Sequence, residues 1–229
     1  LEKINIDAYK IASGEVTNIP LIEKIANSDK AVYISSGMST YDEIDRAIKI
    51  FNNKKNITLM QCTSMYPCDL HYVGLNVLKL FKERYQLDIG FSDHTKSNTA
   101  ALLAFSLGAN SIEKHLTFSK KMYGSDAPYA AEPSQFKDLS VSLQEANLII
   151  NNKVDKDSLT IKLKDMKYVF EKSIVAIRAL KKGDIITKLD LAYKKPGGGI
   201  EYKDIDKILG KRAKLHIKKD EMISTENLL

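Results

Sequence analysis

The sequence predicts an α/β protein in which five strand–helix units form part of a (β/α)8 TIM barrel, followed by a small β-rich domain. Two patterns lead to this expectation. Short apolar runs that end in small polar residues alternate with helix-like stretches, and the runs begin about 22 to 31 residues apart. This is the spacing of parallel strands that are connected by helices. After residue 170 the chain changes to short β-like pieces between turn signals.

The five strands are expected where β-branched and apolar residues run together, at 8–13, 31–36, 57–63, 88–92 and 110–115. Helices are expected at 41–51, 76–85, 99–107 and 136–150. The second and third of these carry apolar residues at three- and four-residue steps. Thr40 and Glu43 form a capping-box pattern at the start of the first helix, and Glu132-Pro133-Ser134 is a start signal before the last.

We expect three parts along the chain: residues 1–150 as the C-terminal part of a barrel domain, 151–170 as a Lys- and Asp-rich linker, and 171–229 as the β-rich domain. In the last part, strands are expected at 173–179, 185–186, 213–217 and 222–223, and helix pieces at 190–191 and 204–209. A domain of about 60 residues has little core of its own, so we expect it to dock against another surface.

An open doubly wound sheet has the same local pattern and is the alternative fold. No Gly-x-Gly-x-x-Gly follows any predicted strand, which argues against a dinucleotide site. Five units cannot close a barrel of eight strands, so a barrel would have its first three strands outside this chain. The chain begins with Leu-Glu-Lys-Ile and not with Met, and we expect the true N-terminus to be absent.

The composition is that of an ordinary globular protein, with 44% hydrophobic and 28% charged residues and a formal net charge of +6. No basic run interleaved with aromatic residues is present, so a nucleic-acid partner is not expected. No apolar stretch is long enough for a membrane span. The mild basic balance suits an anionic small substrate. Cys62 and Cys68 are expected to be reduced thiols.

Polar residues at the ends of the first three strands suggest an anion site. Lys10 lies inside an otherwise apolar strand, where an anionic ligand would offset its burial, although a lysine at a strand edge can also extend into water. Ser13 precedes a glycine, and Ser35 begins a second stretch of hydroxyls followed by glycine, which together favour a phosphate. After the third strand, Ser64 could line the same mouth. Tyr66 could contact a substrate or serve only in packing, and its local sequence favours neither role.

Two histidines follow consecutive strands, His94 after Ser92-Asp93 and His115 after Glu113-Lys114. If the strands are parallel neighbours, both imidazoles lie at one mouth and could hold a divalent metal with open positions for a substrate. A histidine with satisfied hydrogen bonds in the core or at the surface is the alternative for each. Asp126 lies in the loop after the fifth strand and could reach the mouth.

Together these segments resemble the sialic acid synthase family (N-acetylneuraminate synthase and its relatives). The match runs from Lys10 to the C-terminus and rests on motifs in a fixed order: Tyr-Lys-Ile-Ala-Ser-Gly-Glu, Ser-Ser-Gly-Met-Ser-Thr, Cys-Thr-Ser-Met-Tyr-Pro, Gly-Phe-Ser-Asp-His-Thr, Glu-Lys-His-Leu-Thr and Gly-Ser-Asp. The second domain, with Lys-Pro-Gly-Gly-Gly, resembles the family's antifreeze-like (SAF) domain.

The resemblance implies a cytoplasmic enzyme that condenses phosphoenolpyruvate with an N-acetylmannosamine-type sugar to give a nine-carbon 2-keto acid and phosphate. It also implies a divalent metal, Mn or Mg, held by His94 and His115, and a domain-swapped homodimer. Residues at the family's substrate-contacting positions are Lys10, Ser13 and Ser35 for phosphoenolpyruvate, Ser64 and Ser92 near its carboxylate, and Tyr66 and Asp126 for the sugar.

Two departures from the family pattern affect these expectations. The family's first strand supplies a glutamate near the reacting centre and its second strand a phosphate-binding lysine, and neither segment is among these 229 residues. We therefore expect these residues alone to be inactive. Lys195 stands where the family has an arginine that reaches the sugar's N-acetyl group from the partner chain, and a lysine lacks the planar fork of arginine.

Several functions remain open at this point. Legionaminic and pseudaminic acid synthases and polysaccharide-biosynthesis homologues are close alternatives, because the sugar end of the site is the least determined part. A metal-dependent aldolase or a Schiff-base aldolase that uses Lys10 is a second enzyme class. The non-enzymatic alternative is a truncated paralogue that serves as a binding or assembly subunit through its small domain.

Overall fold

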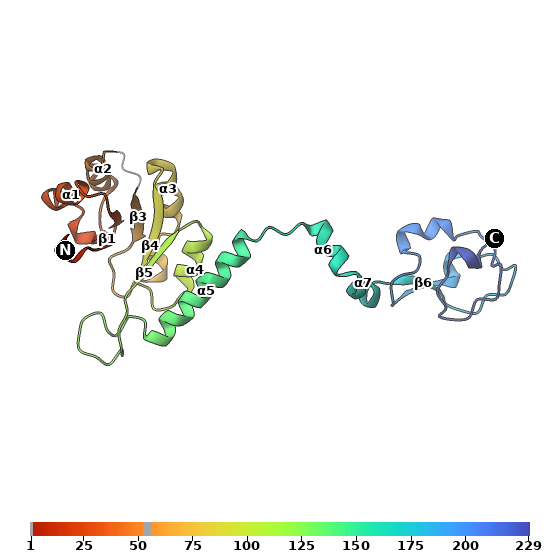
Figure 1. Cartoon of the computed structure of the whole chain (residues 1–229). Helices are drawn as coiled ribbons and strands as arrows, with labels where there is room; N and C mark the ends of the chain where they lie inside the picture. Colours follow the sequence, from red (N-terminus) through yellow and green to blue (C-terminus); the bar gives the residue numbers. More distant parts are fainter. Residues whose placement is uncertain (1, 53–55) are drawn as a thin grey trace. The chain divides into compact units, whose positions relative to one another are not determined.

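The computed structural model describes residues 2–52 and 56–229, and the chain divides into two compact units, Leu1–Asn152 and Lys153–Leu229 (Figure 1). Each unit has a hydrophobic cluster of its own. The limits predicted for the domains and linker stay a prediction. Among the described residues, no helix combines the length and the apolar composition that crossing a membrane requires.

The first unit is built on one parallel sheet of five strands that follow each other in chain order. The strands are β1 (Ala8–Ile11), β2 (Ala31–Ser35), β3 (Ile57–Cys62), β4 (Asp88–Asp93) and β5 (Ser111–Lys114). A doubly wound sheet would reverse its strand order at a switch point, and this sheet does not. The predicted part of a (β/α)8 barrel is therefore confirmed.

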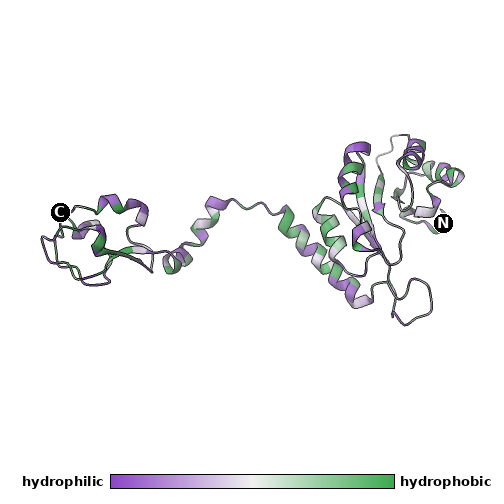
Figure 2. Ribbon diagram, turned by 180° about the vertical axis from the view of Figure 1, so that it is seen from behind, coloured by the Kyte–Doolittle hydropathy of each residue, from purple (hydrophilic) through white to green (hydrophobic). Residues whose placement is uncertain are grey.

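Helices connect the strands and cover the sheet (Figure 1). They are α1 (Ile19–Ala26), α2 (Tyr41–Ile50), α3 (Asn76–Tyr85), α4 (Thr99–Ser106) and α5 (Pro133–Asn151), with short 3-10 helices at Glu2–Ile4, Ser13–Glu15 and Leu70–Tyr72. The predicted capping box of Thr40 and Glu43 starts α2. Helix α4 packs against β4, β5 and α5. Figure 2 shows it as mainly hydrophobic, as a helix covered on several sides requires.

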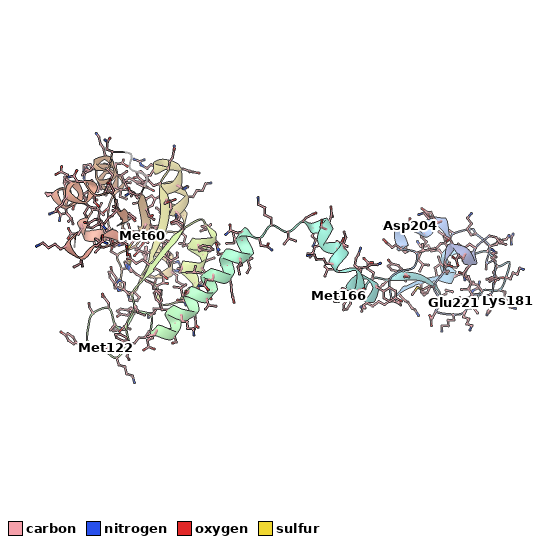
Figure 3. The ribbon with its side chains drawn as sticks, viewed as in Figure 1. Met60, Met122, Met166, Lys181, Asp204 and Glu221 are labelled. Atoms are coloured by element: carbon pink, nitrogen blue, oxygen red, sulfur yellow. The ribbon has the colours of Figure 1, made fainter. Side chains whose placement is uncertain are left out.

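The two faces of the sheet differ in chemistry because side chains alternate along each strand. The outer face carries apolar residues such as Ile34, Leu59 and Phe91, which form the core with the helices. The inner face of the central strands is crowded as well. A Cβ on Gly90 would lie 3.1 Å from the Met60 side chain, so Met60, labelled in Figure 3, fills the space that Gly90 leaves open. Further along the strands, this inner face becomes polar.

The second unit contains α6 (Lys156–Lys162), α7 (Lys164–Phe170) and an antiparallel pair, β6 (Ser173–Ala176) and β7 (Leu191–Lys194). Isolated bridges add Ile185 with Arg212 and Val175 with Met222. Short 3-10 helices lie at Lys188–Asp190, Tyr202–Lys207 and Thr225–Asn227.

Several local predictions in this unit differ from the structure. The strand predicted at 173–179 is formed only over Ser173–Ala176, and the predicted strands 185–186, 213–217 and 222–223 contribute only isolated bridges. The predicted helix piece 190–191 is wrong at its second residue, because Leu191 begins β7 and a 3-10 turn ends at Asp190. The cause is a capping box in which Asp190 accepts hydrogen bonds from Thr187. Residues 151–170, whose role as a linker stays a prediction, contain both α6 and α7. Helix α6 starts where the Asp155 side chain accepts a hydrogen bond from the Asp157 backbone N–H.

Candidate active site

A cavity of about 280 Å³ opens at the carboxyl ends of the five strands. Each strand, or the segment that directly follows it, contributes to the wall, and the lining residues of the strands alternate with the apolar residues of the outer face. Most of the predicted site residues line this cavity, namely Lys10, Ser13, Ser35, Ser64, Tyr66, Ser92, His94 and His115, together with Ala12, Gly14, Met38 and Glu113. Their assigned roles stay predictions.

Lys10 and Glu113 connect the two edge strands of the sheet. The Lys10 Nζ lies 3.2 Å from a carboxylate oxygen of Glu113, although β1 and β5 are separated by three strands. The sheet is therefore curled enough to bring its edges together around the cavity. The Ser92 hydroxyl donates to the other Glu113 oxygen at 3.0 Å. Lys10 thus has a negatively charged partner within the protein, Glu113. From the sequence, an anionic ligand was expected to supply this charge.

Two buried hydroxyls at the cavity have no hydrogen-bond partner. Ser35 is 1% exposed, and neither its Oγ nor the Oγ of Ser64 contacts a donor or acceptor in the described part of the chain. A buried polar group without a partner costs about 1–3 kcal/mol. Both side chains line the cavity, so a bound anion would give them partners.

Ser13 and Ser64 converge on Gly37, which lies just after β2. A Cβ built on Gly37 would lie 2.1 Å from the Ser13 side chain and 2.6 Å from Ser64 Oγ. The Gly37 backbone also has a φ of +44°, which L-residues with side chains rarely adopt. The two serines can therefore approach each other only because position 37 has no side chain.

The two predicted metal-ligand histidines lie side by side. Their ring centroids are 5.2 Å apart, and the Tyr66 ring lies 4.3 Å from His94 and 5.5 Å from His115. His94 Nδ1 is 2.9 Å from the Thr63 carbonyl oxygen. A carbonyl only accepts, so this bond places a proton on Nδ1 and leaves the lone pair of Nε2 for another ligand.

Asp126 gives His115 a similar partner. Its carboxylate lies 3.4 Å from His115 Nδ1, which favours a proton there and leaves Nε2 free to bind. Asp126 belongs to the loop between β5 and α5, whose ends are joined by a bridge between Leu116 and Ala131. Figure 3 shows Met122 in this loop, away from the sheet. The structure therefore brings Asp126 to the histidine pair, as the sequence suggested.

Cys62 is buried beside His94, with its Sγ 3.8 Å from His94 Nδ1 and 3.6 Å from Ser13 Oγ. Burial alone would raise the pKa of the Cys62 thiol, but the hydrogen bond and charge of His94 outweigh it and the pKa lies below its ordinary value. Burial would lower the pKa of His94, yet its bonds to Cys62 and Thr63 raise it overall. Burial, followed by the charge of Cys62, raises the pKa of Tyr66.

The donor set fits a metal that keeps open positions. Among the described residues, no group of three or more His, Cys, Asp or Glu side chains is arranged to hold a metal ion. Two adjacent imidazoles, each with its Nδ1 beside an oxygen, nevertheless offer two Nε2 lone pairs at the edge of the cavity. Such a pair suits a catalytic metal whose other ligands are water and substrate.

Lys195 belongs to the second unit. Its Nζ lies 4.7 Å from the centroid of the Phe170 ring, a cation–π contact. It follows the end of β7 and precedes Pro196. Its predicted contact with a sugar stays a prediction.

Glu113 lines the cavity and Cys62 lies against His94, although neither residue was predicted to belong to the site. The signal that could have found them is the two-residue period of a strand. Glu113 precedes His115 by two residues, and Cys62 precedes Ser64 by two, so each shares a strand face with a predicted site residue. His71 lies outside the cavity, in an exposed turn.

Comparisons with known proteins identify the family of the chain. Residues 1–155 match the model of the NeuB family, and residues 171–229 match the SAF domain. An uncharacterised protein of Methanocaldococcus jannaschii is 37% identical over 100% of this chain and 68% of its own length. An N,N'-diacetyllegionaminic acid synthase of Campylobacter jejuni is 35% identical over 97% of this chain and 67% of its own length. This chain thus spans about two thirds of these relatives.

A solved structure shows the same likeness. The N-acetylneuraminic acid synthetase of Leptospira borgpetersenii superposes with a TM-score of 0.66 at 31% identity, covering 72% of this chain and 60% of that one. The predicted resemblance to sialic acid synthases is confirmed. The chain belongs to the NeuB family and carries a SAF domain in residues 171–229.

Proposed function

We propose that the protein is a sugar-acid synthase that condenses phosphoenolpyruvate with an N-acetylated hexose of the N-acetylmannosamine type. The observation that carries the proposal is the cavity wall, where a lysine and two unpartnered buried serine hydroxyls face the same space as two imidazoles. This combination suits a small dianionic substrate beside a metal-dependent carbonyl reaction. The names of the synthase relatives support it.

Lys10 and the serines would bind the enol phosphate. Lys10 supplies the positive charge, Ser13, Ser35 and Ser64 supply hydroxyl donors, and Glu113 fixes the positions of Lys10 and Ser92. The enol carbon then forms a bond to the aldehyde carbon of the sugar. Water adds at the neighbouring carbon, and phosphate leaves as its C–O bond breaks, which gives the 2-keto acid. Orientation of the two reactants accounts for a large part of such a rate.

His94 and His115 would hold the divalent metal, and imidazole ligands favour Mn over Mg. When bound, the metal supplies Lewis-acid polarisation of the sugar's aldehyde oxygen. Tyr66, whose ring contacts that of His94 and is half exposed, would pack against the sugar. Asp126 would accept hydrogen bonds from the sugar hydroxyls while it orients His115.

The sugar is the least constrained part of the proposal. The similarity to the Campylobacter jejuni relative favours an N,N'-diacetyllegionaminic acid synthase as the second candidate. We further propose that the enzyme acts in the cytoplasm as a domain-swapped homodimer in which Lys195 reaches the partner's sugar site. Sedimentation of a monomer at working concentrations would contradict the dimer.

Phosphate release tests the proposal directly. The assay uses the full-length gene product, because residues 1–229 alone are expected to be inactive. With phosphoenolpyruvate and Mn²⁺, we expect phosphate to be released only when an N-acetylated hexose is added. A panel that contains N-acetylmannosamine and a 2,4-diacetamido-2,4,6-trideoxyhexose would separate the two candidates. No release with any sugar in the panel would refute the synthase function.

Replacing Ser35 by alanine is expected to weaken phosphoenolpyruvate binding without loss of stability. Its buried Oγ has no protein partner, so the alanine variant loses no internal hydrogen bond. A lost hydrogen bond to a charged ligand costs about 1.5–3 kcal/mol, so the KM for phosphoenolpyruvate should rise about tenfold or more. Steady-state kinetics and thermal unfolding measure the two effects.

Ser36→Ala is the matched control for this prediction, because Ser36 is also buried and follows Ser35 directly. Its Oγ donates to Gln61 and accepts from the backbone N–H of Cys62. We expect this variant to lose about 1 kcal/mol of stability and to keep the KM of the wild type. The prediction fails if Ser35→Ala lowers the melting temperature and leaves the KM unchanged.

A further inference from the structure

A buried ion pair lies next to both histidines in the sequence. Asp93 directly precedes His94, Lys114 directly precedes His115, and the two are opposite each other in the register of β4 and β5. Their charged groups are 2.7 Å apart, and the two side chains are only 3% exposed for Lys114 and 0% for Asp93. Neither residue lines the cavity at the carboxyl ends of the strands.

The hydrogen-bonding capacity of the pair is used within the protein. Besides Asp93, the Lys114 ammonium donates to the carbonyl oxygens of Thr95 at 2.8 Å and Ser97 at 3.1 Å. The second oxygen of Asp93 accepts from the Thr95 backbone N–H at 2.8 Å. The pair therefore joins β5 both to the end of β4 and to the loop that follows His94.

Stability alone is a weak reason for such a pair. Removing two charges from water is costly, and well-packed apolar residues often serve as well or better. What an ion pair adds is a fixed geometry, since it permits one register and one distance. Here the two paired residues each directly precede one of the histidines. A small cavity of about 10 Å³ is lined by both members of the pair and by both histidines.

We propose that Asp93 and Lys114 are positioning residues that set the spacing of His94 and His115 for a divalent cation. They act through the backbone, and neither is a ligand. The inference rests on the proposed function, because that function gives the histidine pair its metal. It goes beyond that function by assigning the histidine geometry to two residues outside the cavity.

The test measures metal binding rather than turnover. Mn²⁺ affinity is followed by electron paramagnetic resonance, and Co²⁺ is added separately as a probe whose visible spectrum reports ligand geometry. Lys114→Met is expected to weaken Mn²⁺ binding about tenfold or more, as loss of a residue that orients metal ligands typically does. Its Co²⁺ spectrum should also change.

Two further variants keep the test decisive. Asp93→Asn with Lys114→Met leaves no unpaired buried charge, so it replaces the single variant if that one does not fold. Arg84→Met removes the partner of Asp45 in a more exposed ion pair between α3 and α2. This control should lower stability and leave both metal readouts as in the wild type.

The outcomes separate the two proposals. A wild-type protein that binds no Mn²⁺ overturns the metal role and this inference together. A wild type that binds, with folded Lys114 variants of equal affinity and unchanged Co²⁺ spectrum, overturns the positioning role alone. Failure of both the single and the double variant to fold would assign the pair to global stability and would also overturn it.

Discussion

His94→Ala and His115→Ala are each expected to remove metal-dependent turnover. Each change deletes one of the two imidazoles, and the described residues offer no third side chain arranged to replace it. A bound metal contributes several kcal/mol of transition-state stabilisation, so phosphate release should fall by about a thousandfold or more. Rates are measured over a Mn²⁺ titration, together with Mn²⁺ affinity.

His71→Ala is the matched control for the two histidine variants. His71 lies in the exposed 3-10 turn Leu70–Tyr72, outside the cavity, so its loss should leave the rate and the Mn²⁺ dependence unchanged. Wild-type turnover in either His94→Ala or His115→Ala would remove that residue from the metal site. Equal losses in all three variants would point to a general effect on folding.

The strand pattern explains why so much of the site was predictable. Polar residues at the ends of apolar runs must meet at one edge of a parallel sheet, because all carboxyl ends lie there. This rule alone was enough to predict that Lys10, Ser35 and His94 lie at the cavity. The apolar outer face and the helix spacing similarly predicted the five strands, each within two residues of its observed limits.

The remaining features depend on contacts between residues far apart in the sequence, which a local sequence pattern does not predict. The contact between Lys10 and Glu113 joins residues on opposite edges of the sheet and exists only because the sheet is curled. The strand that starts at Leu191 depends on pairing with β6, so a local helix signal there was misleading. The sequence showed Asp93 and Lys114 beside the histidines, but their burial and mutual contact come from the register of two strands.

Gly37 matters because it has no side chain, which leaves room for Ser13 and Ser64 beside it. Gly37→Ala is therefore the second variant with a large expected effect. The new Cβ would lie 2.1 Å from Ser13 and 2.6 Å from Ser64, so both serines must move. Overpacking of this kind costs about 1–3 kcal/mol of stability. Because both hydroxyls are proposed to bind phosphoenolpyruvate, its KM should rise about tenfold or more.

Gly108→Ala separates the steric effect from the backbone effect. Gly108 also has a positive φ, +99°, but a Cβ there would meet nothing within 4 Å. We expect this control to lose about 1–2 kcal/mol through backbone strain alone and to keep the wild-type KM. If Gly37→Ala behaves in the same way, the serines do not need their present positions. If only Gly37→Ala loses substrate affinity, the approach of Ser13 to Ser64 is what the glycine provides.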